Sequence, residues 1–184
     1  MQAFQLVDKE PFRRLLQYLR PSLSAKDIPH RTKTRDEILE RAELAIQCVK
    51  AKLKHVNSKI SMTFDSWTSI PGDPFLSVTA HYIDSPVDKP QEWVLRSDQL
   101  AFAHIEGNHS GANIGRILIE TIDNYGIRSK VGWLTADNAT NNDTAIQTVA
   151  DTIDPSGEEW DAVEHRIRYV IDQSNTRLLL ISTL

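Results

Sequence analysis

The most constraining feature of the sequence is a change in the spacing of its apolar residues near Lys59. Before that point they recur every three or four positions, which is typical of an amphipathic helix over residues 34–56. Beyond it, Ile60, Met62 and Phe64 alternate with polar residues, which indicates a half-buried strand. The chain must therefore pass from a helical segment into a sheet within a few residues.

The remaining elements follow from the same two spacings. Alternation predicts two further strands separated by short turns, over residues 76–82 and 93–102, and short connections favour an antiparallel meander. A crossover helix over residues 111–125, a fourth strand over residues 131–135 and a last helix reaching residue 151 are predicted next. An N-terminal helical segment precedes them, with a helix over residues 10–20 and a capping box at Thr34 and Glu37.

Composition narrows the class of protein. The 184 residues are 40% hydrophobic and 25% charged, which suits one soluble domain with an N-terminal extension. No apolar run approaches the roughly 20 residues that a membrane helix needs, and the first residues lack the apolar block of a signal peptide. We therefore expect an intracellular protein that is neither secreted nor bound to a membrane. One cysteine excludes an intrachain disulfide.

Charge is unevenly distributed along the chain. Residues 1–60 hold 13 Lys and Arg against 7 Asp and Glu, a balance of +6, and the remaining 8 against 18 give −10, which together make the net −4. A basic arm before an acidic domain is a candidate for phosphate contacts. The alternative is that the four lysines near its end form only a solvated helix face: Lys50, Lys52, Lys54 and Lys59.

Two aspartates stand at the ends of predicted strands. A crossover helix after the third strand can return the chain parallel to the first, which gives the strand order 3-2-1-4. Asp65 and Asp137 would then be neighbours at the carboxyl edge of the sheet, where ligands of open sheets bind. Two adjacent carboxylates suit a divalent cation, Mg²⁺ or Mn²⁺. The alternative is that Asp65 merely ends a strand and that Asp137 caps a helix.

Two motifs resemble those of hAT-type (Ac/hobo-like) DNA transposases. Phe64-Asp65-Ser66-Trp67-Thr68-Ser69 is similar to their first-aspartate segment, and Asp137-Asn138-Ala139 followed by Asn141-Asn142 is similar to the second. The similarity covers about residues 6–168. The resemblance implies an α/β fold of the RNase H-like type, the catalytic domain of a DNA transposase, and a nuclear protein. It also implies that Asp65 and Asp137 are catalytic acids that bind the metal.

The similarity stops near Arg168. The family continues with a fifth strand and a third catalytic acid, and many members carry a preceding BED-type zinc finger, so the chain resembles a truncated copy with an incomplete fold. We expect an N-terminal segment over residues 1–57, a partial RNase H-like domain over residues 58–168 and a divergent tail over residues 169–184. Without the family's fifth strand, the apolar edge at residues 131–134 is expected to be poorly covered and prone to aggregation.

Three functions remain open. The first is an inactive transposase core, with no cleavage by the chain alone. The second is an active metal-dependent nuclease that takes its third acid from a later segment: Glu158, Glu159, Asp161 or Glu164. The third is a module that binds DNA, full-length transposase relatives or a second copy of itself through the basic arm.

Other residue types are expected to be structural. The tryptophans Trp67, Trp93 and Trp133 are expected to fill the core, and Asp143 to be a charge on a helix surface. The spacing of Gly107, Gly111 and Gly115 lacks the Gly-Lys-Ser/Thr ending of a phosphate loop, which favours a helix entry. No zinc site is expected, because the histidines lack metal-ligand spacing: His81, His104, His109 and His165.

Overall fold

The computed structural model describes residues 2–171 and 178–182, and the side-chain surroundings of residues 4–168. The chain divides into two compact units, Met1–Val49 and Lys50–Leu184. In the described residues, no helix combines the length and the apolar character that crossing a membrane would require.

The first unit is helical. It contains α1 (Gln2–Gln5), η1 (Leu6–Asp8), α2 (Glu10–Leu19) and most of α3 (Arg31–His55). The predicted capping box at Thr34 is wrong, because α3 begins at Arg31 and Thr34 lies within it. Asp8 caps the helix instead: its Oδ1 accepts a hydrogen bond from the Arg31 N–H at 3.1 Å. A tertiary contact thus replaces the expected local one.

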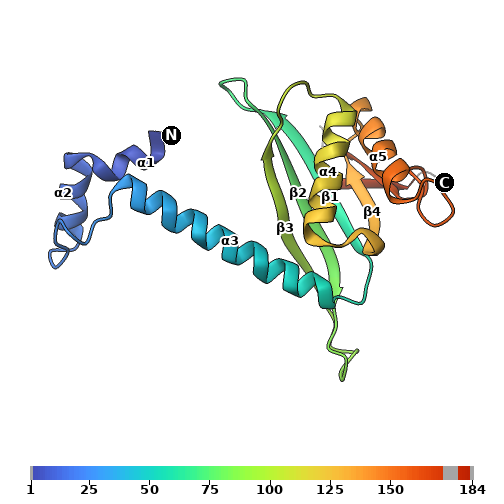
Figure 1. Ribbon diagram of the computed structural model, residues 1–184, viewed down its shortest axis with the longest axis horizontal. Helices are drawn as coiled ribbons and strands as arrows, with labels where there is room; N and C mark the ends of the chain where they lie inside the picture. Colours follow the sequence, from blue (N-terminus) through green and yellow to red (C-terminus); the bar gives the residue numbers. More distant parts are fainter. Residues whose placement is uncertain (1, 172–177, 183–184) are drawn as a thin grey trace. The chain divides into compact units, whose positions relative to one another are not determined.

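The second unit is built on one mixed sheet (Figure 1). Its strands are β1 (Ile60–Thr68), β2 (Pro74–Asp84), β3 (Val94–His104), β4 (Val131–Ala136), β5 (Arg166–Ile171) and β6 (Leu178–Ser182). They lie in the order β3-β2-β1-β4-β5-β6. β1, β2 and β3 pair antiparallel, and β4 pairs parallel with β1. The predicted meander, the 3-2-1-4 order and the α/β RNase H-like class are confirmed.

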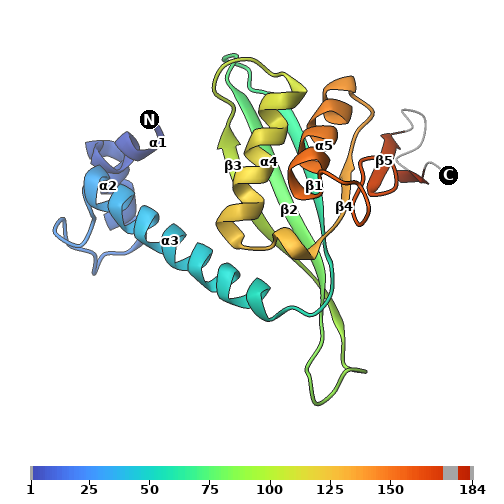
Figure 2. The ribbon, with the colours of Figure 1, turned by 45° about the vertical axis from the view of Figure 1, so that its right-hand side comes forward.

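Two helices cover one face of this sheet. α4 (Gly111–Tyr125) and α5 (Thr140–Ile153) lie side by side over it in both views (Figures 1 and 2). Burial alternates along β1, where Ile60, Met62 and Phe64 are buried and the residues between them are not. The core therefore lies between the helices and one face of the sheet, as the period of two predicts.

A β-bulge shifts the register between the parallel strands β1 and β4. Ile60 is paired with Val131, but Met62 is paired with Leu134, so β4 contains one extra residue at Gly132 and Trp133. The Ser61 Oγ accepts a hydrogen bond from the Trp133 N–H at 3.3 Å within the bulge. A one-residue shift in register exchanges the two faces of a strand. The bulge therefore decides which β4 residues lie level with those at the end of β1.

The expectation of an uncovered edge at residues 131–134 is wrong. The side chains of Val131 and Leu134 are buried, and β5 pairs parallel with β4 from Leu134 onward. The Trp160 side chain, itself buried, anchors the connection by donating from its Nε1 to the Gly132 carbonyl at 2.8 Å. β5 also runs beyond Arg168, where the resemblance ends, because its last residues pair antiparallel with β6.

Polar contacts attach the end of α3 to the sheet. The Asp98 carboxylate accepts from the Lys52 Nζ at 2.9 Å and from the hydroxyl of buried Tyr82 at 2.6 Å. The Lys130 Nζ donates to the carbonyls of Leu53, Lys54 and Val56, which satisfies groups that a helix end leaves free. Burial raises the pKa of Asp98, but the hydrogen bonds from Tyr82 and Lys52 outweigh it and lower that pKa below its ordinary value.

We predict that Asp98→Asn lowers the free energy of unfolding by about 1–3 kcal/mol at neutral pH, because buried Tyr82 loses a charged partner. A carboxyl group whose pKa is lower in the folded state stabilises the fold above about pH 4, and this stabilisation is lost as the pH falls through the folded-state pKa. The difference between wild type and variant in urea unfolding should therefore shrink from pH 7 to pH 3. Asp84→Asn, which removes an exposed pair with Arg96, is the control and should change stability by less than about 1 kcal/mol. An equal loss in both variants would contradict the role given to Asp98.

Two glycines set the approach of α4 to α5. A Cβ on Gly115 would lie 2.7 Å from the Thr148 Cβ and 2.9 Å from the Ala145 carbonyl oxygen. At Gly111 a Cβ would meet the Asn141 carbonyl oxygen at 2.2 Å. The glycine series is therefore a helix-packing surface, in agreement with the helix entry expected from the sequence.

Gly115→Ala is accordingly expected to destabilise the second unit by about 1–3 kcal/mol, because the clash involves backbone that cannot rotate away. The midpoint of thermal unfolding measures the effect. Ala112→Ser, at an exposed position of the same helix, serves as the control. A Gly115→Ala protein as stable as wild type would mean that the helices separate without cost.

Candidate functional site

Asp65 lies near the carboxyl end of β1 on the face of the sheet away from α4 and α5. It is exposed, whereas Phe64 before it is buried. Its strand partner on β2 is Ser77. A hollow of about 360 Å³ opens around it, lined by Thr63, Phe64, Asp65, Trp67, Ser77 and Thr79. The carboxylate of Asp65 is thus accessible from solvent at the edge where a ligand of an open sheet binds.

Asp137 follows directly on β4, at the same level of the sheet. The register pairs Thr63 with Thr135, and two further residues along each strand lead to Asp65 and Asp137. Neighbouring strands lie about 4.8 Å apart, so the two backbones are adjacent at this edge. Without the bulge in β4, Asp65 would instead lie level with Ala136. The structure therefore brings together the two positions that the sequence singled out.

The Asp137 carboxylate is held by the start of α5. Its Oδ1 accepts from the Ala139 N–H at 3.0 Å and from the Asn142 Nδ2 at 2.6 Å. Asn142 is only 6% exposed, so this amide is a fixed part of the interior. Asp137 is not the N-cap of α5, which is Ala139; its Oδ1 instead closes the turn that precedes the helix. No described hydrogen bond engages Oδ2.

An ion pair between buried Arg166 and half-exposed Asp143 lies next to Asp137. Arg166 is 6% exposed and forms a salt bridge with Asp143. Its Nη2 also donates to the Asp137 carbonyl at 3.4 Å, and Arg168 pairs with the same Asp143 at 3.3 Å. Burial is the main reason why the pKa of Arg166 falls below its usual value, Arg168 lowers it further, and Asp137 opposes both. Asp143 is therefore more than the surface charge expected from the sequence.

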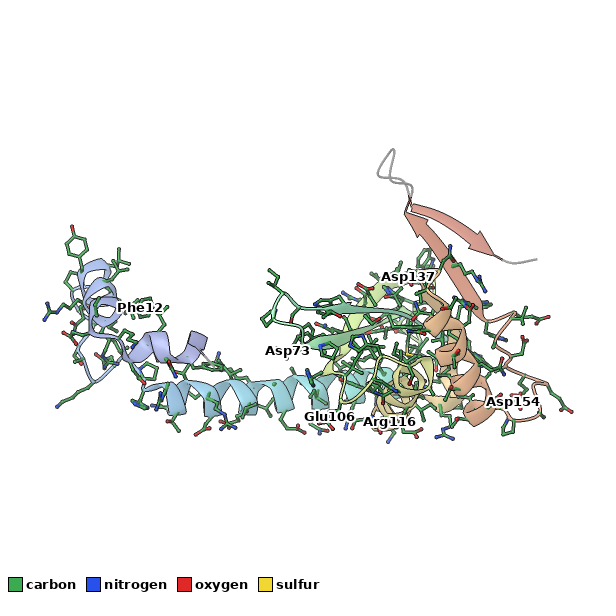
Figure 3. All side chains as sticks on the ribbon, turned by 90° about the horizontal axis from the view of Figure 1, so that it is seen from above. Phe12, Asp73, Glu106, Arg116, Asp137 and Asp154 are labelled. Atoms are coloured by element: carbon green, nitrogen blue, oxygen red, sulfur yellow. The ribbon has the colours of Figure 1, made fainter. Side chains whose placement is uncertain are left out.

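Glu158 and Glu159, two of the four candidates for a third acid, lie away from this edge. α5 has 14 residues and at about 1.5 Å per residue carries the chain roughly 20 Å from Asp137. Figure 3 shows Asp137 and Asp154 at opposite ends of that helix. Glu158 and Glu159 line a hollow there with Val131, at the amino end of β4. Asp161 accepts from the N–H groups of Val163 and Glu164, so it orders the connection to β5.

Within the described residues, no group of three or more His, Cys, Asp or Glu side chains is arranged to hold a metal ion. Asp65 and Asp137 supply two carboxylates and only oxygen donors, which fits Mg²⁺ or Mn²⁺ better than a softer metal. Such a site would leave most coordination positions to water or to a phosphate. The donor chemistry therefore fits a cation held by two protein ligands, and the role of both aspartates stays a prediction.

Other residues singled out in the sequence have different surroundings from those expected. The core assignment of three tryptophans is wrong: Trp67, Trp93 and Trp133 are 37%, 60% and 44% exposed, because they fall on the uncovered face or at its margin. Three of the four lysines form hydrogen bonds within the second unit, to which they belong: Lys50 donates to Asn124, Lys52 to Asp98 and Lys59 to the Ser129 carbonyl.

An aromatic cluster beside Asp65 was not predicted. Trp67 stacks on Phe75 with ring centroids 5.8 Å apart, and Phe102 lies 5.5 Å from Phe75. His104 contacts the same Phe75 ring, whereas His81 bonds the Thr63 hydroxyl and His165 stacks between Trp133 and Trp160. Alternation on three neighbouring strands could have indicated the cluster, because their register aligns these positions on one face.

Comparison with known proteins agrees with this geometry. The ZBED1 RNase-like domain family matches residues 63–164, a range that contains both aspartates, all of β4 and most of β1. The chain belongs to this family. The resemblance of the chain to hAT-type transposases is confirmed, since the chain is 30% identical over 151 residues to the AC transposase of Zea mays. The matched stretch covers 82% of this chain and 18% of that relative.

Two further relatives match the chain over similar lengths. The AC9 transposase of Zea mays is 30% identical over 151 residues, and the transcriptional regulator tpeD of Talaromyces stipitatus is 26% identical over 150. Each match covers 82% of this chain and 17% of the relative, so the chain spans less than a fifth of these proteins. No solved structure matches the chain.

Asn142→Ala is expected to lower the free energy of unfolding by about 1–3 kcal/mol, since half-buried Asp137 loses a short hydrogen bond from a buried donor. Gln147→Ala, on the exposed side of the same helix, should change it by less than about 0.5 kcal/mol. Urea unfolding of the two variants measures the difference. Equal stability of both would show that Asn142 does not hold the Asp137 turn.

Proposed function

We propose that the second unit is a transposase-type RNase H-like core in which Asp65 and Asp137 bind one divalent cation against a nucleic-acid phosphate. The observation that carries this proposal is the parallel pairing of β1 with β4, whose bulged register brings both aspartates to one edge of the sheet. Exposed Asp65 and the unengaged Oδ2 of Asp137 provide the ligand atoms.

In such a site the protein holds the carboxylates of Asp65 and Asp137 in place. Asn142 and the Ala139 N–H hold the Asp137 carboxylate through one oxygen and leave the other available. Asp65 pairs with Ser77 of β2, and Thr63, two residues before it, pairs with Thr135 of β4, so its backbone is held in the sheet. A bound Mg²⁺ or Mn²⁺ supplies positive charge that binds and polarises a phosphate.

We further propose that the chain alone does not cleave DNA. Two-ion cleavage of a phosphodiester needs both cations placed on opposite sides of the scissile phosphate, and two carboxylates do not fix that arrangement. Glu158 and Glu159 lie at the far end of β4, and a misplacement of even about 1 Å costs on the order of 10²-fold in rate. This proposal favours a cation-dependent binding core over an independent nuclease.

DNA is the proposed partner, and the nucleus is the proposed location. The family supports both, because its curated relatives include transposases. The aromatic cluster of Trp67, Phe75, Phe102 and His104 supports single-stranded or distorted DNA, since exposed rings stack on bases. Full-length transposase relatives and a second copy of the chain are further proposed partners.

The test is Mn²⁺ binding by the purified 184-residue chain, measured by isothermal titration calorimetry. Wild type should bind one ion weakly, and Asp65→Asn should weaken binding by about tenfold or more, because one of two charged ligands is lost. Asp88→Asn, at an exposed turn, should bind like wild type. Binding that Asp65→Asn leaves unchanged would place the ion elsewhere and overturn the site.

Cleavage is tested on labelled transposon-end and hairpin DNA with Mn²⁺. Wild type and Asp65→Asn are expected to give the same background. If wild type nicks the DNA and the variant does not, the chain is an active nuclease, and the proposal that it does not cut is wrong.

A further inference from the structure

The least expected group near the candidate site is a buried positive charge. Arg166 is 6% exposed, although a guanidinium almost never loses its charge. Removing such a charge from water is costly unless anions or hydrogen-bond acceptors compensate for it. Asp143 is its carboxylate partner and the Asp137 carbonyl a second contact, while its buried Nε has no hydrogen-bond partner among the described residues.

The charges around this edge nearly balance without any bound ion. Arg166 and Arg168 share one carboxylate, Asp143, which leaves one positive charge in excess beside Asp137. Asp137 offsets that excess, and Asp65 is then the one carboxylate of this set without a cationic partner. A pair of aspartates that would otherwise repel each other thus already has a cation behind one of its members.

We propose that Arg166 is a positioning residue that acts as a resident counter-ion of the Asp137 turn. Its Nη2 holds the Asp137 carbonyl while Asn142 holds the carboxylate, so the turn forms without a metal ion. The same charge repels an incoming divalent cation and weakens its binding. This inference rests on the proposed cation site, and it adds that the site's affinity is set by Arg166 and Asp143.

Removing the positive charge of Arg166 and removing the negative charge of Asp143 must then change the affinity for Mn²⁺ in opposite directions. Arg166→Gln removes the repelling charge and should tighten Mn²⁺ binding by about three- to tenfold. Asp143→Asn leaves Arg166 without its main partner, increases the positive charge near Asp137 and should weaken binding by a similar factor. Arg166→Lys keeps the charge and should restore the wild-type affinity. A merely structural role would weaken binding in all three variants.

The experiment is calorimetric titration of each variant with Mn²⁺, after circular dichroism has shown that it is folded. Arg128→Gln is the matched control: it makes the same change in net charge at the other end of α5, where Arg128 pairs with Asp123, and should bind like wild type. If Arg166→Gln is not folded, Asp143→Asn and Arg166→Lys decide between the two roles.

The outcomes separate this inference from the site on which it rests. Tighter binding in Arg166→Gln together with weaker binding in Asp143→Asn supports it. Wild-type binding that both variants weaken, or leave unchanged, overturns the counter-ion role and leaves the cation site intact. No Mn²⁺ binding in any of the proteins overturns both.

Discussion

The parallel pairing of β1 with β4 is the contact on which the rest of the second unit depends. A parallel pair cannot be closed by a tight turn, so α4 must cross one face of the sheet to bring the chain back. Once α4 lies there, α5 packs beside it where Gly111 and Gly115 allow close approach. Both strands then end at the same edge, and Asp65 and Asp137 follow from that geometry.

The same edge shows how a protein can place carboxylates without relying on an ion. Asp137 is held by a buried amide, a backbone N–H and a neighbouring guanidinium. These contacts fix the turn between β4 and α5, because each buried polar group there would be costly if left unpaired. The structural role of Asp137 is therefore compatible with its proposed role as a cation ligand.

The face of the sheet away from α4 and α5 carries exposed aromatic side chains. Its exposed aromatic rings lie in rows set by the register of β1, β2 and β3, next to Asp65. Single exposed apolar residues are common on proteins, but contiguous ones mark surfaces that bind something. Asp65 and Trp67 line the same hollow, so this carboxylate and the cluster belong to one surface of the second unit.

The sequence by itself determined the order and kind of the main elements from α2 to α5, because apolar periods of two and of three to four residues follow directly from strand and helix geometry. It also determined the 3-2-1-4 strand order, through short turns and one crossover. Only the tertiary structure decided the bulge at Gly132, the burial of Arg166 beside Asp137 and the pairing of β5 with β4. Alternation shows that a strand has two faces but not which one is covered, so Trp67 and Trp133 could not be assigned from sequence. A bulge and the ion pair of buried Arg166 with Asp143 depend on residues brought together from distant segments, and no local pattern in the sequence indicates them.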